Sequence, residues 1–356
     1  MAFLVPARRL PAYVARYLRL FTWRRAANLL LVASSLGLSR LCRRPIVWGR
    51  PLMLMVEPTN LCNLKCPLCP SGNGQLQRPR GQMALEDFKK LVDQVSGHAF
   101  MLLLWNQGEP YINRQFDELV SYARSRRMFT CTSTNGHFIR TPARARAVVD
   151  SGLDELVFSV DGVDQATYAK YRVNGRLDRV LEAIRLVLQA RREARQSTPR
   201  VSLQYIVMRH NETDLAAVEE LARNLGVDRL LIKTAQVYTD EEARTFLPAE
   251  AGLSRYERDR DGGLQVVGQP ARGCKVLWYS SMVNWDGTVT PCCFDKDADF
   301  AMGNACGSGS FGRIWVSRSY RRFRAAVLRD RRAVSMCTNC SEGYRGMFSV
   351  VKELVD

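Results

Sequence analysis

From residue 51 onward, short apolar runs alternate with longer stretches in which apolar side chains recur about every 3.6 residues. Short apolar runs are typical of buried strands, and the 3.6-residue spacing is typical of helices that pack one face on a core. We therefore predict six strands, at residues 52–57, 99–105, 128–133, 155–160, 201–208 and 229–233. The helices predicted between them lie at residues 85–95, 116–126, 142–151, 177–195 and 214–225.

A regular strand–helix alternation indicates parallel βα units, because each helix returns the chain to the start of the next strand. Six such units predict an α/β fold, a partial (β/α)6 barrel of the TIM type, over residues 51–240. In barrels of this kind the loops after the carboxyl ends of the strands carry the chemistry. Polar residues at those strand ends are therefore the first candidates for a functional site.

The strand–helix rhythm ends after residue 233. Residues 239–260 are highly charged and are predicted to be helical, and residues 261–263 are predicted to form a turn. We assign residues 241–271 to a connection and residues 272–345 to a small cysteine-rich α+β domain. Residues 346–356 are assigned to a C-terminal tail.

The formal charge of +17 is concentrated at the N-terminus, because residues 1–50 hold ten arginines and no acidic residue. Residues 51–356 carry 42 basic and 35 acidic residues, so a general phosphate-binding surface is not indicated. The uncharged stretch 26–39 is shorter than the roughly 20 residues that a spanning helix needs. The extension is expected either to lie on an anionic membrane surface or to pack as a helix on the protein body.

A secretory signal is disfavoured because no A-x-A-like cleavage site follows the apolar stretch, and a cytoplasmic location is expected. Eleven cysteines, an odd number placed in C-x-x-C-like groups, do not indicate a secreted disulfide framework. This placement favours a metal or an iron–sulfur cluster as their ligand.

Three cysteines, spaced C-x-x-x-C-x-x-C, follow the first predicted strand: Cys62, Cys66 and Cys69. Three thiolates on one loop can hold three irons of a cubane, which leaves a coordination position open on the fourth. A structural zinc loop is the alternative, but it needs a fourth ligand nearby, and the next candidate is His98. The spacing and its place after a first barrel strand resemble the signature of the radical S-adenosyl-L-methionine (SAM) superfamily. That resemblance implies a [4Fe–4S] cluster held by these three cysteines and by SAM.

After the second strand, the stretch Gln107, Gly108, Glu109, Pro110 resembles the Gly-Gly-Glu-Pro stretch of that family, with Gln107 in place of the first glycine. In the family this stretch receives the amino group of SAM. The same resemblance assigns SAM contacts at the ends of the third and fourth strands and beyond, to Thr134, Asn135, Ser159, Asp161 and Arg172. Arg172 is expected to pair with the SAM carboxylate.

On the fifth and sixth strands the same family positions fall on Gln204, Asn211 and residues 234–236, where ribose and adenine are bound. Short polar residues at strand ends are common in any barrel, so an ordinary structural role stays open for these positions.

Four further cysteines are candidate ligands of a second cluster: Cys274, Cys292, Cys337 and Cys340. The stretch from Gly287 to Cys292 resembles the Gly-x-x-x-x-Cys hairpin of the SPASM domain, in a shortened, twitch-like form. This implies one auxiliary [4Fe–4S] cluster, with a four-cysteine zinc site as the alternative. Cys293 and Cys306 are possible substitutes in the ligand set, whereas Cys42 and Cys131 are expected to be buried and apolar in character.

The resemblance implies an enzyme that reductively cleaves SAM and uses the 5′-deoxyadenosyl radical to abstract hydrogen from its substrate. An auxiliary cluster favours an oxidoreductase acting on a peptide or a small molecule, with flavodoxin or ferredoxin as the reductant. No catalytic base is assigned from the sequence. A tRNA-modifying protein of the same superfamily and a non-catalytic scaffold with two metal sites stay open as alternatives.

Overall fold

The computed structural model describes residues 18–268, 273–307, 309–343 and 349–354. Six parallel strands pair in chain order: β1 (Met53–Val56), β2 (Met101–Leu103), β3 (Phe129–Thr134), β4 (Glu155–Ser159), β5 (Arg200–Val207) and β6 (Arg229–Thr234). This confirms the partial barrel, and every strand and helix bound predicted for residues 51–240 lies within two residues of the observed one.

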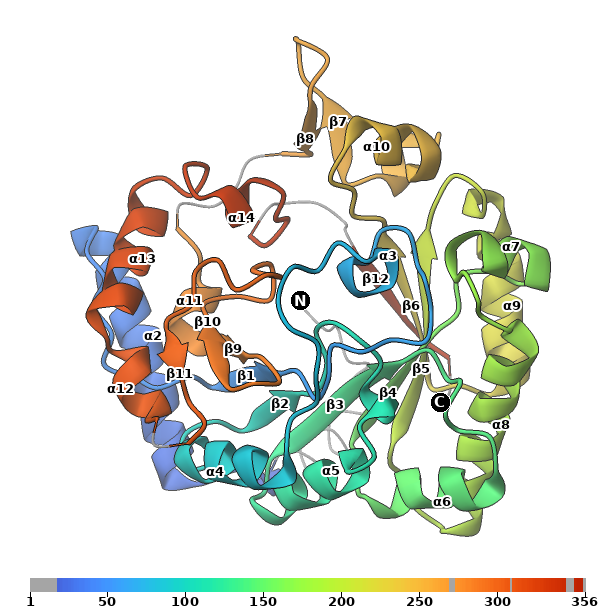
Figure 1. The fold of residues 1–356 in the computed structure, drawn as a ribbon, viewed down its shortest axis with the longest axis horizontal. Helices are drawn as coiled ribbons and strands as arrows, with labels where there is room; N and C mark the ends of the chain where they lie inside the picture. The colour runs from blue at the N-terminus through green and yellow to red at the C-terminus, as the bar shows by residue number, and fades with distance from the viewer. Residues whose placement is uncertain (1–17, 269–272, 308, 344–348, 355–356) are drawn as a thin grey trace.

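Five helices cover the outside of this sheet (Figure 1): α4 (Leu85–Val95), α5 (Phe116–Ser125), α6 (Pro142–Asp150), α8 (Leu177–Glu193) and α9 (Leu215–Leu225). The apolar spacing explains how they pack. In α4, for example, Phe88, Leu91, Val92 and Val95 fall on one side and are buried in the main core. Two shorter helices, α3 (Pro70–Asn73) and α7 (Gln165–Tyr171), lie in the loops after β1 and β4.

The cysteine-rich part does not form a sheet of its own. Strand β9 (Ser280–Val283) pairs in parallel with β1, and β10 (Thr288–Thr290) and β11 (Gly303–Asn304) continue outward from it. At the other edge, β12 (Ser349–Glu353), which the sequence placed in a tail, pairs antiparallel with β6. An open barrel leaves two unpaired edges, and these strands cover both of them in one ten-stranded sheet.

The connection between barrel and cysteine-rich part is only partly helical, unlike the prediction for residues 239–260. Helix α10 (Asp240–Phe246) begins in a capping box formed by Thr239 and Glu242. It ends before Pro248, because the residue preceding a proline is driven out of the helical region. A hairpin of β7 (Tyr256–Arg258) and β8 (Leu264–Val266) follows.

Four helices complete the cysteine-rich part: α11 (Val276–Tyr279), α12 (Phe311–Trp315), α13 (Arg318–Arg329) and α14 (Ser335–Thr338). Helix α2 (Trp23–Cys42) from the N-terminal extension packs beside them. Across the described ranges, no helix combines the length and the hydropathy that crossing a bilayer requires. Cys131 is buried as expected, whereas Cys42 is exposed at the end of α2, which corrects the expectation for that residue.

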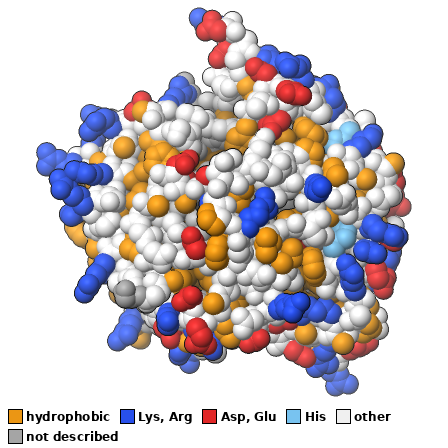
Figure 2. Space-filling model, viewed as in Figure 1, with side chains coloured by type: hydrophobic (Ala, Val, Ile, Leu, Met, Phe, Trp, Pro, Cys, Tyr) orange, Lys and Arg blue, Asp and Glu red, His pale blue; other side chains and the backbone are white. Residues whose placement is uncertain are grey.

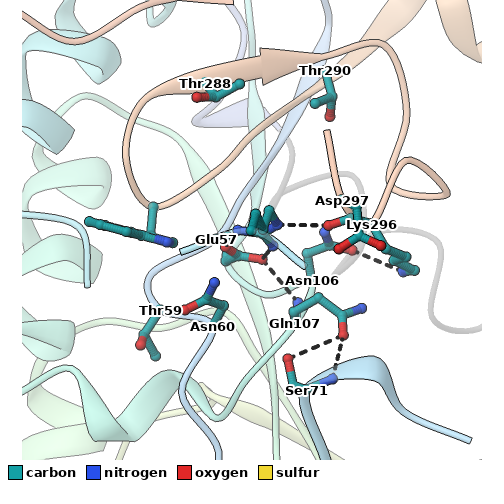
Figure 3. A network of polar contacts seen from close by, with 12 residues as sticks. Glu57, Thr59, Asn60, Ser71, Asn106, Gln107, Thr288, Thr290, Lys296 and Asp297 are labelled. Atoms are coloured by element: carbon teal, nitrogen blue, oxygen red, sulfur yellow. Dashed lines mark hydrogen bonds and ion pairs between the residues drawn. The ribbon is translucent and has the colours of Figure 1, made fainter. Parts of the chain in front are cut away.

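A buried ion pair joins the barrel to the cysteine-rich part (Figure 3). Glu57, directly after β1, has no exposed surface, and both of its carboxylate oxygens accept hydrogen bonds from Arg78, at 2.5 and 2.7 Å. Arg78 also donates from Nε to the carbonyl of Lys296, at 2.7 Å. The Lys296 ammonium in turn donates to Oδ1 of Asn106, at 3.2 Å. One guanidinium therefore connects the end of β1, the loop at residues 74–82 and the segment after Cys293.

We predict that Arg78→Met lowers the free energy of unfolding by about 3–5 kcal/mol, because it leaves the buried Glu57 carboxylate without a cation. The double variant Glu57→Gln, Arg78→Met should recover part of this loss, since no unpaired charge is then buried. The exposed Arg80 supplies the matched control, with a change of about 0.5 kcal/mol or less for Arg80→Met. Urea unfolding measures all three, and equal midpoints for Arg78→Met and Arg80→Met would contradict the prediction.

Candidate functional site

A single cavity of about 950 Å³ extends from the inside of the barrel into the cysteine-rich part. It is bounded by residues of β1 to β6 and by residues of α11, β9 and β12. Nine of the eleven cysteines lie on its wall: Cys62, Cys66, Cys69, Cys131, Cys274, Cys292, Cys293, Cys337 and Cys340. The two cysteine groups that the sequence assigned to separate clusters therefore face one shared space.

The first group lies on the loop between β1 and α3. A Cβ at Gly72 would lie 2.6 Å from the amide nitrogen of Cys66, so only glycine allows this close approach. Burial raises the pKa of the Cys62 thiol to about 12 and also raises that of Cys66. Binding of iron must therefore displace protons from these thiols. A cation is already at hand, because Nη1 of Arg172 donates to Sγ of Cys66 at 3.8 Å.

The stretch after β2 is held against this loop. Gly108 has a φ of +78°, and a Cβ there would lie 2.5 Å from the carbonyl oxygen of Thr59. The amide of Glu109 donates to the carbonyl of Leu61, at 2.7 Å. The family-like glycine is therefore required by the approach of two loops, and that approach brings Glu109 to the cavity wall. Pro110 is buried and lies off the wall.

The Glu109 carboxylate is buried yet well supplied with donors. It accepts from the hydroxyl of Thr134 and from the amide of Asn135, both at 2.7 Å. Burial nevertheless raises the pKa of Glu109 to about 7. A donor or cation arriving from the cavity would favour the charged form of Glu109, and an ammonium group supplies both.

Gln107, which replaces the first glycine of the family stretch, has a function of its own in the loop (Figure 3). Its side-chain oxygen accepts from the amide of Ser71 at 3.3 Å and from the hydroxyl of Ser71 at 3.2 Å. It also lies 3.8 Å from Sγ of Cys69. Its backbone amide donates to Glu57. Gln107 therefore ties the end of β2 to the start of α3, directly behind the third cysteine.

Asp161 and Arg172 form a pair, but only Arg172 lies on the cavity wall. Nε of Arg172 donates to Oδ2 of Asp161 at 2.5 Å, and the amide of Ile206 donates to Oδ1 at 2.7 Å. Both carboxylate oxygens are thus engaged, and Asp161 has no exposed surface. The sequence assigned Asp161 to cofactor contact, whereas the structure places it behind Arg172, where it orients the guanidinium.

The remaining candidates divide in the same way. Thr134, Asn135, Ser159, Gln204 and residues 234–236 lie on the cavity wall. Asn211 does not, because its side-chain amide donates to the carbonyls of Asp161 and Ile206 and so stabilises the turn after β5. For Asn211 the structure therefore supports the ordinary structural role.

The second cysteine group surrounds Arg331. Burial raises the pKa of the Cys274, Cys337 and Cys340 thiols, and the nearby guanidinium opposes that rise. Cys292 lies on the same wall, next to Cys293. Among the described His, Cys, Asp and Glu residues, no three gather closely enough to hold a single metal ion.

The two possible substitutes in the auxiliary ligand set are not equivalent. Cys293 faces the cavity, and a hydrogen bond from Cys292 together with the nearby Lys296 lowers the pKa of its thiol. Cys306 lies off the wall, just after β11, beside Gly287 in the turn between β9 and β10. Only Cys293 is therefore placed to replace one of the four.

Three charged residues that line the cavity or hold its loops in place were not identified from the sequence: Arg78, Lys296 and Lys233. Arg78 and Lys296 lie in loops without a periodic pattern, so no sequence signal distinguishes them from solvated cations. Lys233 ends the predicted sixth strand and faces the cavity, and burial lowers its pKa. Alternate residues of a strand share one face, so the position of Lys233 two and four residues after Leu231 and Arg229, which also face the cavity, was the one sequence signal that could have identified it.

These residues fit iron–sulfur clusters and SAM. Clusters ligated by thiolates are negatively charged, and each cysteine group has a cation beside it: Arg172 in the barrel, and Arg331 and Lys296 in the cysteine-rich part. Two buried side-chain donors on the wall, Nδ2 of Asn106 and Nε2 of Gln236, have no partner among the described residues. Buried donors are normally hydrogen-bonded, so both of these groups are available to donate to a bound group.

Family and structure comparisons agree with this geometry. Residues 56–230 match the Radical SAM superfamily, and residues 274–341 match the SPASM family, an iron-sulfur cluster-binding domain. A PqqA peptide cyclase of Granulibacter bethesdensis is 26% identical over 53% of this chain and 48% of that protein, so the match spans about half of its length. A PqqA peptide cyclase of Gluconobacter oxydans is 28% identical over 68% of this chain and 70% of that protein.

Among solved structures, Streptococcus suis SuiB bound to the precursor peptide SuiA has a TM-score of 0.58 and 14% identity. The match covers 82% of this chain and 70% of SuiB, and it shows a shared fold. The two family matches coincide with the two cysteine groups of one cavity. The radical SAM domain implies SAM and a SAM-binding [4Fe–4S] cluster as cofactors, and the SPASM domain implies an auxiliary iron–sulfur cluster. The chain belongs to the radical SAM superfamily and carries a SPASM domain.

Proposed function

We propose that this protein is a radical SAM maturase that oxidatively modifies a peptide inside the shared cavity. The observation that carries the proposal is that both cysteine groups line one space of about 950 Å³. A substrate in that space lies between the SAM site and the auxiliary site. The similarity to PqqA peptide cyclases and to the peptide-bound SuiB fold supports a peptide as the substrate class.

In this proposal Cys62, Cys66 and Cys69 hold the cluster that binds SAM. Glu109 receives the amino group of SAM and Arg172 its carboxylate, with Asp161 orienting Arg172. Gln107, Gly108, Thr134, Asn135 and Ser159 form the surrounding wall. When bound, the cluster and SAM supply a 5′-deoxyadenosyl radical, a reagent that no side chain can provide.

Cys274, Cys292, Cys337 and Cys340 hold the auxiliary cluster, which supplies a one-electron acceptor when bound. Lys296 and Arg331 place positive charge beside these thiolates, which favours the reduced, more negative state of a cluster. This charge arrangement supports a net oxidation of the substrate over a redox-neutral rearrangement.

Purified protein with SAM and a reductant such as flavodoxin or ferredoxin should release 5′-deoxyadenosine, and a peptide encoded beside its gene should accelerate the release and lose two hydrogens per modification. Chromatography and mass spectrometry measure both. Acceleration by a sugar-like small molecule alone would overturn the peptide assignment, and failure to form 5′-deoxyadenosine would overturn the enzyme assignment.

Anaerobically reconstituted protein should hold about eight irons, as two four-iron clusters. The triple alanine variant of Cys62, Cys66 and Cys69 should keep about half of that iron. Cys306→Ala is the matched control, and it should keep all of it because Cys306 lies off the cavity wall. Iron and zinc analysis measures this content. About four irons with one zinc would contradict the prediction and indicate a zinc site in place of the auxiliary cluster.

Glu109→Gln should weaken SAM binding by about tenfold to a hundredfold, because one charge-assisted hydrogen bond is lost. The pKa of about 7 adds a pH signature. Glu109 is increasingly charged as the pH rises through 7, so SAM affinity of the parent protein should rise from about pH 6 to 8, while the glutamine variant stays flat. Equilibrium dialysis of cluster-loaded protein measures this, with the exposed Glu86→Gln as control. Parallel pH profiles for the parent protein and Glu109→Gln would assign the amino group to another acceptor.

A further inference from the structure

Helix α2 packs against the protein through its polar side. Its buried residues are Arg25, Asn28, Val32, Ser35 and Ser39. Arg25 is 5% exposed, and its guanidinium donates to four backbone carbonyls, those of Leu20, Ser96, Arg126 and Arg127. This is the reverse of an ordinary surface helix, which buries its apolar stripe.

Further polar contacts fix the rotation of α2 about its axis. Asn28 donates to the carbonyl of Arg50 at 3.0 Å and accepts from the amide of Arg50 at 2.7 Å. Near the other end, the indole nitrogen of Trp278 donates to the Ser39 hydroxyl at 3.1 Å. A rotation that buried the leucines instead would leave these groups without partners.

The locked orientation presents an apolar stripe to the outside. Trp23 is 82% exposed, Leu30 69% and Leu41 79%. They are separated by seven and eleven residues, about two and three helical turns, so they share one face opposite the buried side. Further large apolar residues are exposed on α2 and in the segments that flank it: Leu18, Phe21, Leu29, Leu31 and Trp48. Apolar side chains concentrated in this way mark an interaction surface.

Arginines surround the stripe. Four exposed arginines lie at the ends of α2, at Arg24, Arg40, Arg43 and Arg44, and residues 1–50 contain no acid. Helix α13 joins α2 in one apolar cluster and adds exposed arginines at 318, 321, 322 and 329. Figure 2 shows Lys and Arg side chains projecting along the left edge of the molecule, where Figure 1 places α13 and α2.

We propose that α2, with the neighbouring arginines of α13, is a docking surface for an anionic lipid bilayer. Trp23 and the leucines would enter the boundary between headgroups and acyl chains, and the arginines would contact lipid phosphates. A second copy of this chain fits the surface poorly, because a two-fold interface would place the same arginine-rich face against itself. The arginines around the apolar stripe favour a partner with a negatively charged surface.

This surface belongs to the body of the enzyme. Removing residues 1–47 would remove Arg25 with its hydrogen bonds to four backbone carbonyls, and would expose the apolar cluster to which Val32 belongs. Such a truncation would confuse loss of folding with loss of docking. Point substitutions at exposed positions avoid this, because surface changes of this kind leave stability nearly unchanged.

The test is sedimentation of the full, cluster-loaded chain with vesicles of phosphatidylcholine containing about 30% phosphatidylserine. The variant Trp23→Ser, Leu30→Ser, Leu41→Ser should lose binding by at least about tenfold. Changing the four α2 arginines to glutamine should lose about a hundredfold or more, and salt should weaken binding of the parent protein. Matched controls are glutamine substitutions at four exposed arginines of α8 and α9 and the region between them, Arg185, Arg192, Arg195 and Arg223, which should bind like the parent.

Three results would overturn the proposal. Equal binding by the α2 variants and the controls would remove α2 from membrane contact. A parent protein that ignores vesicles but forms a dimer, dissolved by the serine variant in sedimentation velocity, would assign the surface to a second copy. Binding abolished by deletion of residues 2–17 and unaffected by the α2 substitutions would assign it to that segment. Iron content and SAM cleavage should be unchanged in all α2 variants, so this test is independent of the proposed function.

Discussion

The requirement that the Glu57 carboxylate be neutralised inside the protein organises the site. Glu57 lies five residues before the first cluster cysteine and has no exposed surface, so its charge needs a partner that water cannot supply. Arg78 donates to this carboxylate from both terminal nitrogens, and its Nε donates to the carbonyl of Lys296, three residues after Cys293. Gln107 uses the same carboxylate. The positions of the cysteine loop, the second strand end and the cysteine-rich part thus depend on one buried charge.

The cavity shows a second use of charge. Its thiols are buried, and burial raises the pKa of Cys62, Cys66 and Cys274. A guanidinium near each group reduces the cost of converting them to thiolates when iron binds. The protein therefore supplies part of the charge balance in advance, and SAM and the clusters supply the rest.

Features that depend on local pattern were predictable, and features that depend on distant partners were not. The six barrel strands and five helices follow from apolar periodicity, and the two cysteine groups from their spacing. The pairing of β9 with β1 and of β12 with β6 depends on edges created by the barrel itself, so short segments such as Ser280–Val283 carry no signal for it. The orientation of α2 is a similar case, because leucines suggest burial until the carbonyls around Arg25 are known. Asp161 and Arg172 were both identified from the sequence as site residues. That Asp161 lies behind Arg172, away from the cavity, depends on the amide of Ile206 in β5, which donates to the Asp161 carboxylate.

Because β9 is hydrogen-bonded along four residues to β1, the segments that carry the two cysteine groups are joined through one continuous sheet. Their separation is then set by strand register, which changes only in whole-residue steps that would turn side chains to the wrong face. The cysteine-rich part is consequently not an exchangeable module. A barrel supplied with a foreign partner domain would have to match the register of β1 as well as the ligands, or it would expose a bare strand edge to other chains.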